Sequence, residues 1–130
     1  RRSSDLIDIV ACFAPGGKVL VHLQENPEHP DYEVSQEVLA TFAQYPELTV
    51  VPVAAPKLLR DKIGFVDYSY INHYVVNGAV ILCAFDDPND QLAADVLQQV
   101  YPDREIVLVD ARELFARGGG IHCITQQQPL

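Results

Sequence analysis

One cysteine of this chain stands in a setting that suits covalent chemistry. Cys123 follows the run Gly118-Gly119-Gly120 and lies on a short β-like stretch. Glycines lack a Cβ and let another molecule approach the backbone closely, and the thiolate is the nucleophilic form of cysteine. The pattern makes Cys123 a candidate nucleophile presented at the start of a strand. The residues alone leave open the alternative of a buried cysteine in a flexible tail.

The histidine beside this cysteine does not suit the role of its base. Successive side chains of a strand point to opposite faces, so we expect His122 to point away from the thiol and to have a structural role. The glycine run is also not typical of a phosphate-binding loop, because no Lys-Ser/Thr follows it.

The remaining ionisable and sulfur-bearing residues predict structure rather than chemistry. No metal site is expected, because the other histidines lack ligand spacing; they are His22, His29 and His73. The acidic group before the second predicted helix is interpreted as a solvated turn and helix cap; it comprises Asp86, Asp87 and Asp90. Two cysteines in predicted strands should be inert core residues, namely Cys12 and Cys83. Three tyrosines should alternate along a strand and pack or line an interface, namely Tyr68, Tyr70 and Tyr74.

The elements that would position these residues occur twice. Tyr45-Pro46-Glu47 leads into an apolar run ending at Ala55, and Tyr101-Pro102-Asp103 leads into a similar run ending at Ala111. Both runs are rich in β-branched residues and predict strands. A helical pattern precedes each run, with apolar residues spaced three or four apart; they are Val34, Val38, Leu39 and Phe42 in the first copy, and Leu92, Val96, Leu97 and Val100 in the second.

A hairpin is predicted before each helix. The first joins residues 9–13 to residues 18–23 through Ala14-Pro15-Gly16-Gly17, and the second joins residues 70–76 to residues 79–85 through Asn77-Gly78. Asn-Gly between apolar runs is the strongest short hairpin signal. The fold class is therefore α/β, with two strand-strand-helix-strand units over about residues 6–55 and 66–125. Because a repeat usually needs further copies or a partner to cover its open faces, we expect this pair to be incomplete alone.

Composition narrows the function classes. The chain has 130 residues, is 48% hydrophobic and carries a net charge of −9, with three cysteines and no methionine. The acidic charge disfavours nucleic-acid binding, and no apolar run approaches the ~20 residues of a membrane span. Sparse cysteines favour a reducing compartment, so we expect a cytoplasmic location. The missing initiator methionine indicates a processed chain or a fragment.

Several motifs together resemble the agmatine deiminases, in the wider peptidylarginine-deiminase-like (pentein, guanidino-group-modifying) superfamily. The resemblance extends from about Leu6 to Pro129. The longest matching motif is GGGIHCITQQQP at residues 118–129, supported by YINHYVVNG at 70–78, FDDPND at 85–90 and PDREIV at 102–107.

The resemblance implies a fold and a reaction. It implies a five-bladed α/β propeller of strand-strand-helix-strand units, of which residues 1–130 would be a single C-terminal portion. The reaction it implies is hydrolysis of a guanidino group, such as that of agmatine, to a ureido group with release of ammonia, which is a step of polyamine metabolism. Cys123 would be the nucleophile, Asp8 would contact the guanidinium, and Gly119 and Gly120 would line the substrate site. No metal or organic cofactor is implied.

One departure from the family pattern bears on activity. The family has a Gly-His-hydrophobic-Asp motif where this chain has Asp5-Leu6-Ile7-Asp8, so Leu6 stands at the position of the catalytic histidine. Leucine cannot transfer protons. Two hypotheses follow: a deiminase present as its C-terminal part, or a non-catalytic, deiminase-derived scaffold that acts by association. Association with missing blades, or with further copies of the chain, is expected in either case.

Overall fold

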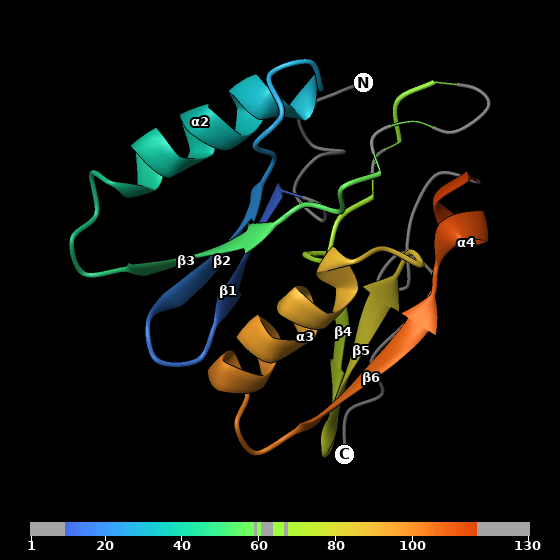
Figure 1. Cartoon of the computed structure of the whole chain (residues 1–130). Coiled ribbons are helices and arrows are strands. Elements are labelled where there is room, and N and C mark those ends of the chain that lie inside the picture. The colour runs from blue at the N-terminus through green and yellow to red at the C-terminus, as the bar shows by residue number, and fades with distance from the viewer. Residues whose placement is uncertain (1–9, 59, 61–63, 67, 117–130) are drawn as a thin grey trace.

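The computed structural model describes residues 10–58, 60, 64–66 and 68–116, and Figure 1 shows the arrangement of their helices and strands. They form two consecutive strand-strand-helix-strand units, each with a three-stranded mixed sheet. This confirms the α/β fold class and the repeat. The outer limits of the repeats near residues 6 and 125 lie outside the described residues.

The first unit comprises β1 (Ala11–Ala14), β2 (Lys18–Leu23), α2 (Asp31–Phe42) and β3 (Thr49–Ala54). β2 is the central strand, antiparallel to β1 and parallel to β3. Gly16 and Gly17 have φ of 78° and 71°, a left-handed conformation that glycine adopts without a Cβ clash and that closes the β1–β2 turn. α2 is the crossover helix that a parallel pair of strands requires.

The second unit repeats this plan with β4 (Tyr74–Val76), β5 (Ala79–Ala84), α3 (Asn89–Val100) and β6 (Glu105–Asp110). β5 is central, antiparallel to β4 and parallel to β6. The Asn77-Gly78 turn joins β4 to β5, with Gly78 at φ 80°. A short helix, α4 (Arg112–Ala116), follows β6.

The prediction of a strand over residues 70–76 is wrong for its first half. β4 begins only at Tyr74, and Tyr70 lies in a turn before it. The next three residues form a tight turn of their own, in which the His73 N–H donates a 2.9 Å hydrogen bond to the Ile71 carbonyl. Tyr68 also precedes the strand, so the three tyrosines do not alternate along it. Burial explains the difference, because Tyr70 is fully buried and its hydroxyl donates a 2.6 Å hydrogen bond to Asp90. This tertiary contact outweighs the local preference for a strand.

A single hydrophobic core joins the two units. α3 lies between the sheets and contacts both β3 and β6, whereas α2 lies on the other side of the first sheet (Figure 1). Leu20 and Val53 of the first unit belong to the same buried cluster as Phe85 and Leu97 of the second. Tyr68 stacks on Phe85 with ring centroids 4.4 Å apart. Burial of these side chains is the main force holding the units together.

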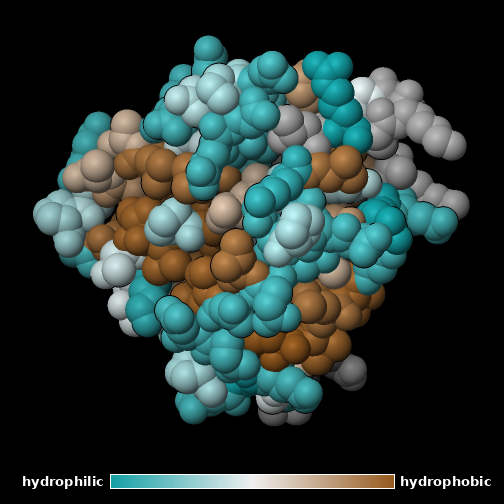
Figure 2. All heavy atoms as spheres, in the orientation of Figure 1, coloured by the Kyte–Doolittle hydropathy of each residue, from teal (hydrophilic) through white to brown (hydrophobic). Residues whose placement is uncertain are grey.

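The surface carries apolar as well as polar regions. Figure 2 shows hydrophobic residues gathered in more than one area of the visible face. The exposed large apolar side chains include two on β6, Leu108 and Val109. Within the described part of the chain, no helix combines the length and the apolar character that crossing a bilayer requires.

Candidate functional site

The residues that the sequence assigns to chemistry lie outside the described residues. These are the proposed nucleophile Cys123, the carboxylate Asp8, the glycines Gly119 and Gly120, and also Leu6 and His122. Their assignments stay predictions. The described residues do show a groove and three polar clusters near the joint between the units.

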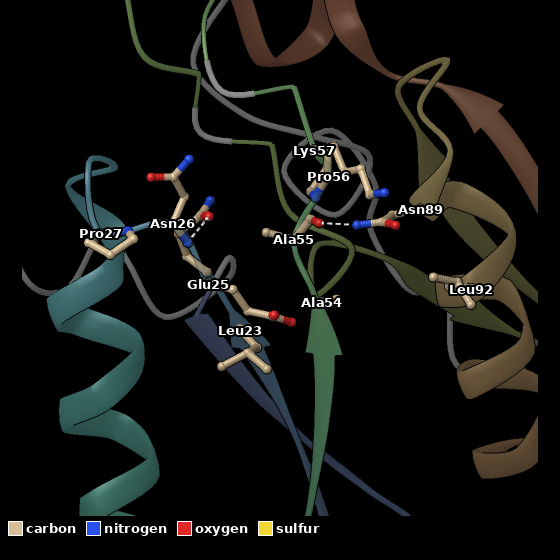
Figure 3. A pocket seen from close by; sticks show the side chains of 11 residues that line it. Leu23, Glu25, Asn26, Pro27, Ala54, Ala55, Pro56, Lys57, Asn89 and Leu92 are labelled. Carbon is tan, nitrogen blue, oxygen red and sulfur yellow. Dashed lines mark hydrogen bonds between the residues drawn. The ribbon is translucent and has the colours of Figure 1, made fainter.

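The groove lies where β2 and β3 end and α3 begins. Its volume is about 580 Å³, and it is lined by residues 23–27, residues 54–57, Asn89 and Leu92. Figure 3 shows these residues arranged around the end of β3, between α2 and α3. Crevices beyond the carboxyl ends of parallel strands are common ligand sites in α/β proteins. Glu25 and Lys57 supply the charges of the lining, and both are exposed.

Asp87 and Asn89 fix one wall of this groove. The Asp87 carboxylate accepts hydrogen bonds from the backbone N–H groups of Lys57 and Leu58, at 3.0 and 2.8 Å. The Asn89 side-chain amide donates a 2.7 Å hydrogen bond to the Ala55 carbonyl (Figure 3). Side chains at the start of α3 therefore hold the segment that leaves the first sheet.

Asp90 organises the same turn from within the second unit. Its carboxylate accepts hydrogen bonds from the backbone N–H groups of Phe85 and Asp87, and a third from the Tyr70 hydroxyl. Burial, followed by the hydrogen bond to Asp90, raises the pKa of Tyr70 far above its usual value, so the phenol stays protonated and donates. The N-cap residue of α3 is Pro88, so the acidic side chains do not cap the helix in the predicted way, although Asp87 accepts a 2.9 Å hydrogen bond from the Asn89 N–H. The expectation of a solvated turn is wrong for Asp87, which is buried.

Cys12 and His73 bring the two units into contact at a second place. The Cys12 Sγ lies 4.0 Å from the Nε2 of His73, and the Nδ1 of that ring lies 3.1 Å from the Tyr70 carbonyl. A carbonyl only accepts, so Nδ1 carries the proton and Nε2 faces the thiol as an acceptor. Burial raises the Cys12 pKa to about 11. Cys12 is therefore a neutral thiol at physiological pH and a poor nucleophile.

His22 and His29 meet around Asp31, at the start of α2. Their nearest ring nitrogens lie 4.0 and 3.8 Å from the Asp31 carboxylate. His29 donates from Nε2 to the Val66 carbonyl at 2.8 Å and accepts the Asp31 N–H at Nδ1, which fixes its neutral tautomer. Burial, with a smaller contribution from His29, lowers the His22 pKa to about 4. Among the described residues, no group of three or more histidine, cysteine or carboxylate side chains is placed to hold a metal ion.

Two of these clusters bring together residues that lie far apart in the sequence, and no sequence pattern predicts their contacts. Lys57 follows the first unit, whereas Asp87 lies between β5 and α3 of the second. Cys12 lies on β1, whereas His73 directly precedes β4. The one sequence signal that bears on them is the acidic group around Pro88, which marks a helix start. This signal indicates that side chains form hydrogen bonds there, but it does not indicate which backbone groups are their partners.

Comparison with known proteins identifies the family. The sequence profile of the Porphyromonas-type peptidyl-arginine deiminases matches residues 3–129. The chain belongs to this family. A relative from Streptomyces coelicolor, provisionally assigned as an agmatine deiminase, is 58% identical over 129 residues, which are 95% of this chain and 38% of the relative. The chain thus spans well under half the length of that relative.

Solved structures of this family confirm the fold. The agmatine deiminase of Enterococcus faecalis superposes with a TM-score of 0.83 at 30% identity, covering 94% of this chain and 40% of that one. A provisionally assigned arginine deiminase from Porphyromonas gingivalis superposes with a TM-score of 0.86 at 28% identity, covering 94% and 38%. The two units therefore match part of the pentein fold of these enzymes.

Proposed function

We propose that this chain contributes the nucleophile to an agmatine-deiminase-type hydrolase, as the C-terminal part of its catalytic domain. The observation that carries the proposal is family membership over residues 3–129, together with the Cys123 motif at residues 118–129. The relatives named above as agmatine deiminases point to agmatine as the substrate. The net charge of −9 is compatible with a cationic substrate, because it raises the local concentration of cations.

The proposed reaction needs no metal or organic cofactor. The Cys123 thiolate attacks the guanidinium carbon and forms a carbon–sulfur bond. The bond from that carbon to one amino group then breaks; the group takes a proton from the former guanidinium and leaves as neutral ammonia, and a covalent amidino-cysteine remains. Water then adds to the same carbon and displaces the cysteine sulfur, which regenerates the thiol and leaves a ureido group. Asp8 pairs with the guanidinium, and Gly119 and Gly120 allow it to approach the backbone. We place the reaction in the cytoplasm and in polyamine metabolism.

Leu6 supports a second candidate function. A deiminase of this type needs a proton-transferring side chain where Leu6 stands, and leucine has none. The second candidate is a non-catalytic, deiminase-derived scaffold that acts by association. The scaffold predicts that Cys123 has no role in turnover, even when residue 6 is a histidine. The deiminase predicts that Leu6→His produces turnover that depends on Cys123.

An assay with a restored histidine separates the two candidates. The chain and its Leu6→His variant are each mixed with the part of the Streptomyces coelicolor relative that this chain does not match, and co-sedimentation checks assembly. With agmatine, we expect the Leu6→His mixture to release ammonia at least about 100-fold faster than the unaltered mixture. The ureido product is identified by mass spectrometry.

Two cysteine variants of the Leu6→His chain complete the assay. Cys123→Ser should abolish ammonia release, because a hydroxyl is a far weaker nucleophile than a thiolate. Cys12→Ser is the matched control and should leave the rate unchanged, because Cys12 is a protonated, structural thiol. An assembled but inactive Leu6→His mixture favours the scaffold, and activity that survives Cys123→Ser rejects the proposed nucleophile.

A further inference from the structure

Two side chains of the kinds that commonly bind metal ions face each other where the first unit meets the second. Cys12 lies on β1, and His73 directly precedes β4. The Cys12 Sγ is 4.0 Å from the Nε2 of His73, although the two residues are 61 positions apart in the chain. A thiol is a weak hydrogen-bond donor, so a contact of this length contributes little by itself. The spacing does fit a metal ion placed between the two atoms.

The histidine is already oriented as a metal ligand. His73 is 6% exposed, and its Nδ1 donates a 3.1 Å hydrogen bond to the Tyr70 carbonyl, so Nε2 presents its electron pair to the sulfur. Histidines that bind metals usually donate their other ring N–H to a carbonyl or a carboxylate, which fixes the tautomer and the ring orientation. The Tyr70 carbonyl supplies this contact, and an ion could bind Nε2 without a change of tautomer.

The spacing of the two atoms selects the coordination geometry. Zinc forms bonds of about 2.3 Å to cysteine sulfur and about 2.0 Å to histidine nitrogen, and Cu(I), with the same filled d shell, forms bonds of similar length. An ion bound to both atoms at 4.0 Å separation makes a sulfur–metal–nitrogen angle of roughly 140°. A structural zinc site requires about 109° and four ligands, but no group of three or more is placed to hold an ion among the described residues. A wide angle and a soft thiolate ligand favour Cu(I).

The surroundings of the pair favour an ion with a single positive charge. Cys12 packs against the hydrophobic core, and the Tyr101 ring lies 6.2 Å from the His73 ring. Burial, followed by the nearby Cys12, raises the pKa of Tyr101, so its phenol is neutral. A thiolate, Cu(I) and a neutral imidazole carry no net charge together, whereas a divalent ion would leave one positive charge in an apolar setting. The Arg104 guanidinium, which lies over the Tyr101 ring, would repel that charge.

We propose that Cys12 and His73 bind one Cu(I) ion at the joint between the two units. On binding, the S–H bond of Cys12 breaks and its proton passes to solvent. The sulfur and Nε2 each donate an electron pair to the ion, and no electron is transferred. Burial raises the Cys12 pKa to about 11, so the free protein holds the thiol proton and each bound ion releases it. The inference does not depend on the proposed function, and its test has no activity readout.

Competition with bicinchoninate, a chelator that is coloured when it holds Cu(I), tests the proposal in the absence of oxygen. The chain carries Cys123→Ser, so that the sulfur of the proposed nucleophile cannot bind copper. This chain should take up one Cu(I) ion and release one proton. Zn(II) should bind far more weakly, because two ligands do not satisfy its preference for four. Zn(II) binding as tight as that of Cu(I) would contradict the proposed geometry and charge.

Two further variants each remove one ligand from this Cys123→Ser chain. Cys12→Ser replaces the sulfur with a hydroxyl, and His73→Asn keeps an N–H donor for the Tyr70 carbonyl but lacks Nε2. Each should weaken Cu(I) binding by at least about 100-fold, because even a change in the outer contacts of a metal site can cost about that factor. Circular dichroism checks that both variants are folded. Cu(I) binding that stays as tight in either folded variant would overturn the proposal.

Cys83→Ser is the matched control. It also replaces a cysteine with serine, and the new hydroxyl can donate to the Asn72 carbonyl as the Cys83 thiol does. The affinity for Cu(I) should stay unchanged, and a loss equal to that of Cys12→Ser would reject Cys12 as the specific ligand.

X-ray absorption at the copper edge tests the ligands without altering either of them. The copper-loaded Cys123→Ser chain should show one sulfur and one nitrogen neighbour around the ion. A spectrum with two sulfur neighbours, or with none, would overturn the proposal even if a ligand variant failed to fold.

Discussion

His22 shows how burial can outweigh a nearby charge at the scale of a single residue. Its ring lies 4.0 Å from the Asp31 carboxylate, a contact that favours the charged imidazolium. The ring is nevertheless buried, and desolvation, with the neighbouring His29, lowers its pKa to about 4. His22 is therefore neutral in the folded protein at pH values where it would be charged in the unfolded chain.

This difference predicts that acid destabilises the fold. The unfolded chain binds the proton at pH 6.5 and the folded chain only near pH 4, so stability should fall as the pH drops through this window. The shift corresponds to a loss of up to about 3 kcal/mol in the free energy of unfolding. Urea unfolding at several pH values from about 7.5 to 4 measures this loss, because that range covers the titration of His22 in the unfolded and in the folded chain.

A non-titrating variant provides the control for this prediction. His22→Gln keeps a polar side chain and should flatten the dependence of the unfolding free energy on pH between the two pKa values. Carboxylates titrate in both proteins, so the difference between the two curves isolates His22. Identical slopes for the two proteins would contradict the assignment.

The turn before α3 links two secondary-structure elements, because its Asp87 binds both the start of α3 and the segment after β3. Asp87 accepts hydrogen bonds from three backbone N–H groups, two of them on the segment that leaves β3. Asp87→Asn leaves one acceptor oxygen where there were two, and at least one of the three backbone N–H groups then loses its partner. We expect a loss of about 1–3 kcal/mol in the free energy of unfolding, measured by urea denaturation.

The neighbouring residue offers a matched control. Asp86 is exposed and has a φ of 53°, a conformation that asparagine also tolerates. Asp86→Asn should change stability by less than about 0.5 kcal/mol, although it removes the same charge. If the two variants lost equal stability, the effect would come from charge and not from the hydrogen bonds of Asp87.

The helices and strands could be predicted from the sequence where short stretches of neighbouring residues determine them. Runs rich in β-branched residues, the Asn77-Gly78 turn and apolar residues spaced three or four apart predict the strands, the second hairpin and the two helices that the structure shows. The prediction of a strand over residues 70–76 is wrong for its first half, because the burial of Tyr70 and its hydrogen bond to Asp90 are tertiary interactions that a local pattern does not show. The Asp87 bonds to Lys57 and Leu58 could not be predicted for the same reason. The proposed nucleophile came from a motif match, and no described contact bears on it.

At the scale of the whole molecule, the shared core couples the two units. Leu20 and Val53 of the first unit pack in one cluster with Phe85 and Leu97 of the second. Neither unit can unfold without exposing apolar surface of the other. We therefore expect a single cooperative transition, in which urea curves followed by far-ultraviolet circular dichroism and by tyrosine fluorescence coincide. Two separated transitions would show that the units are independent.

The parallel pairs also set the order of events during translation. β2 can pair with β1 as soon as both leave the ribosome, but its other edge must wait for β3, which lies beyond the whole of α2. At about 5–20 residues per second, this wait lasts on the order of seconds. The second unit repeats the delay between β5 and β6. Nascent chains of this protein therefore present an open sheet edge twice, and each interval is a time when chaperones would protect it from mispairing.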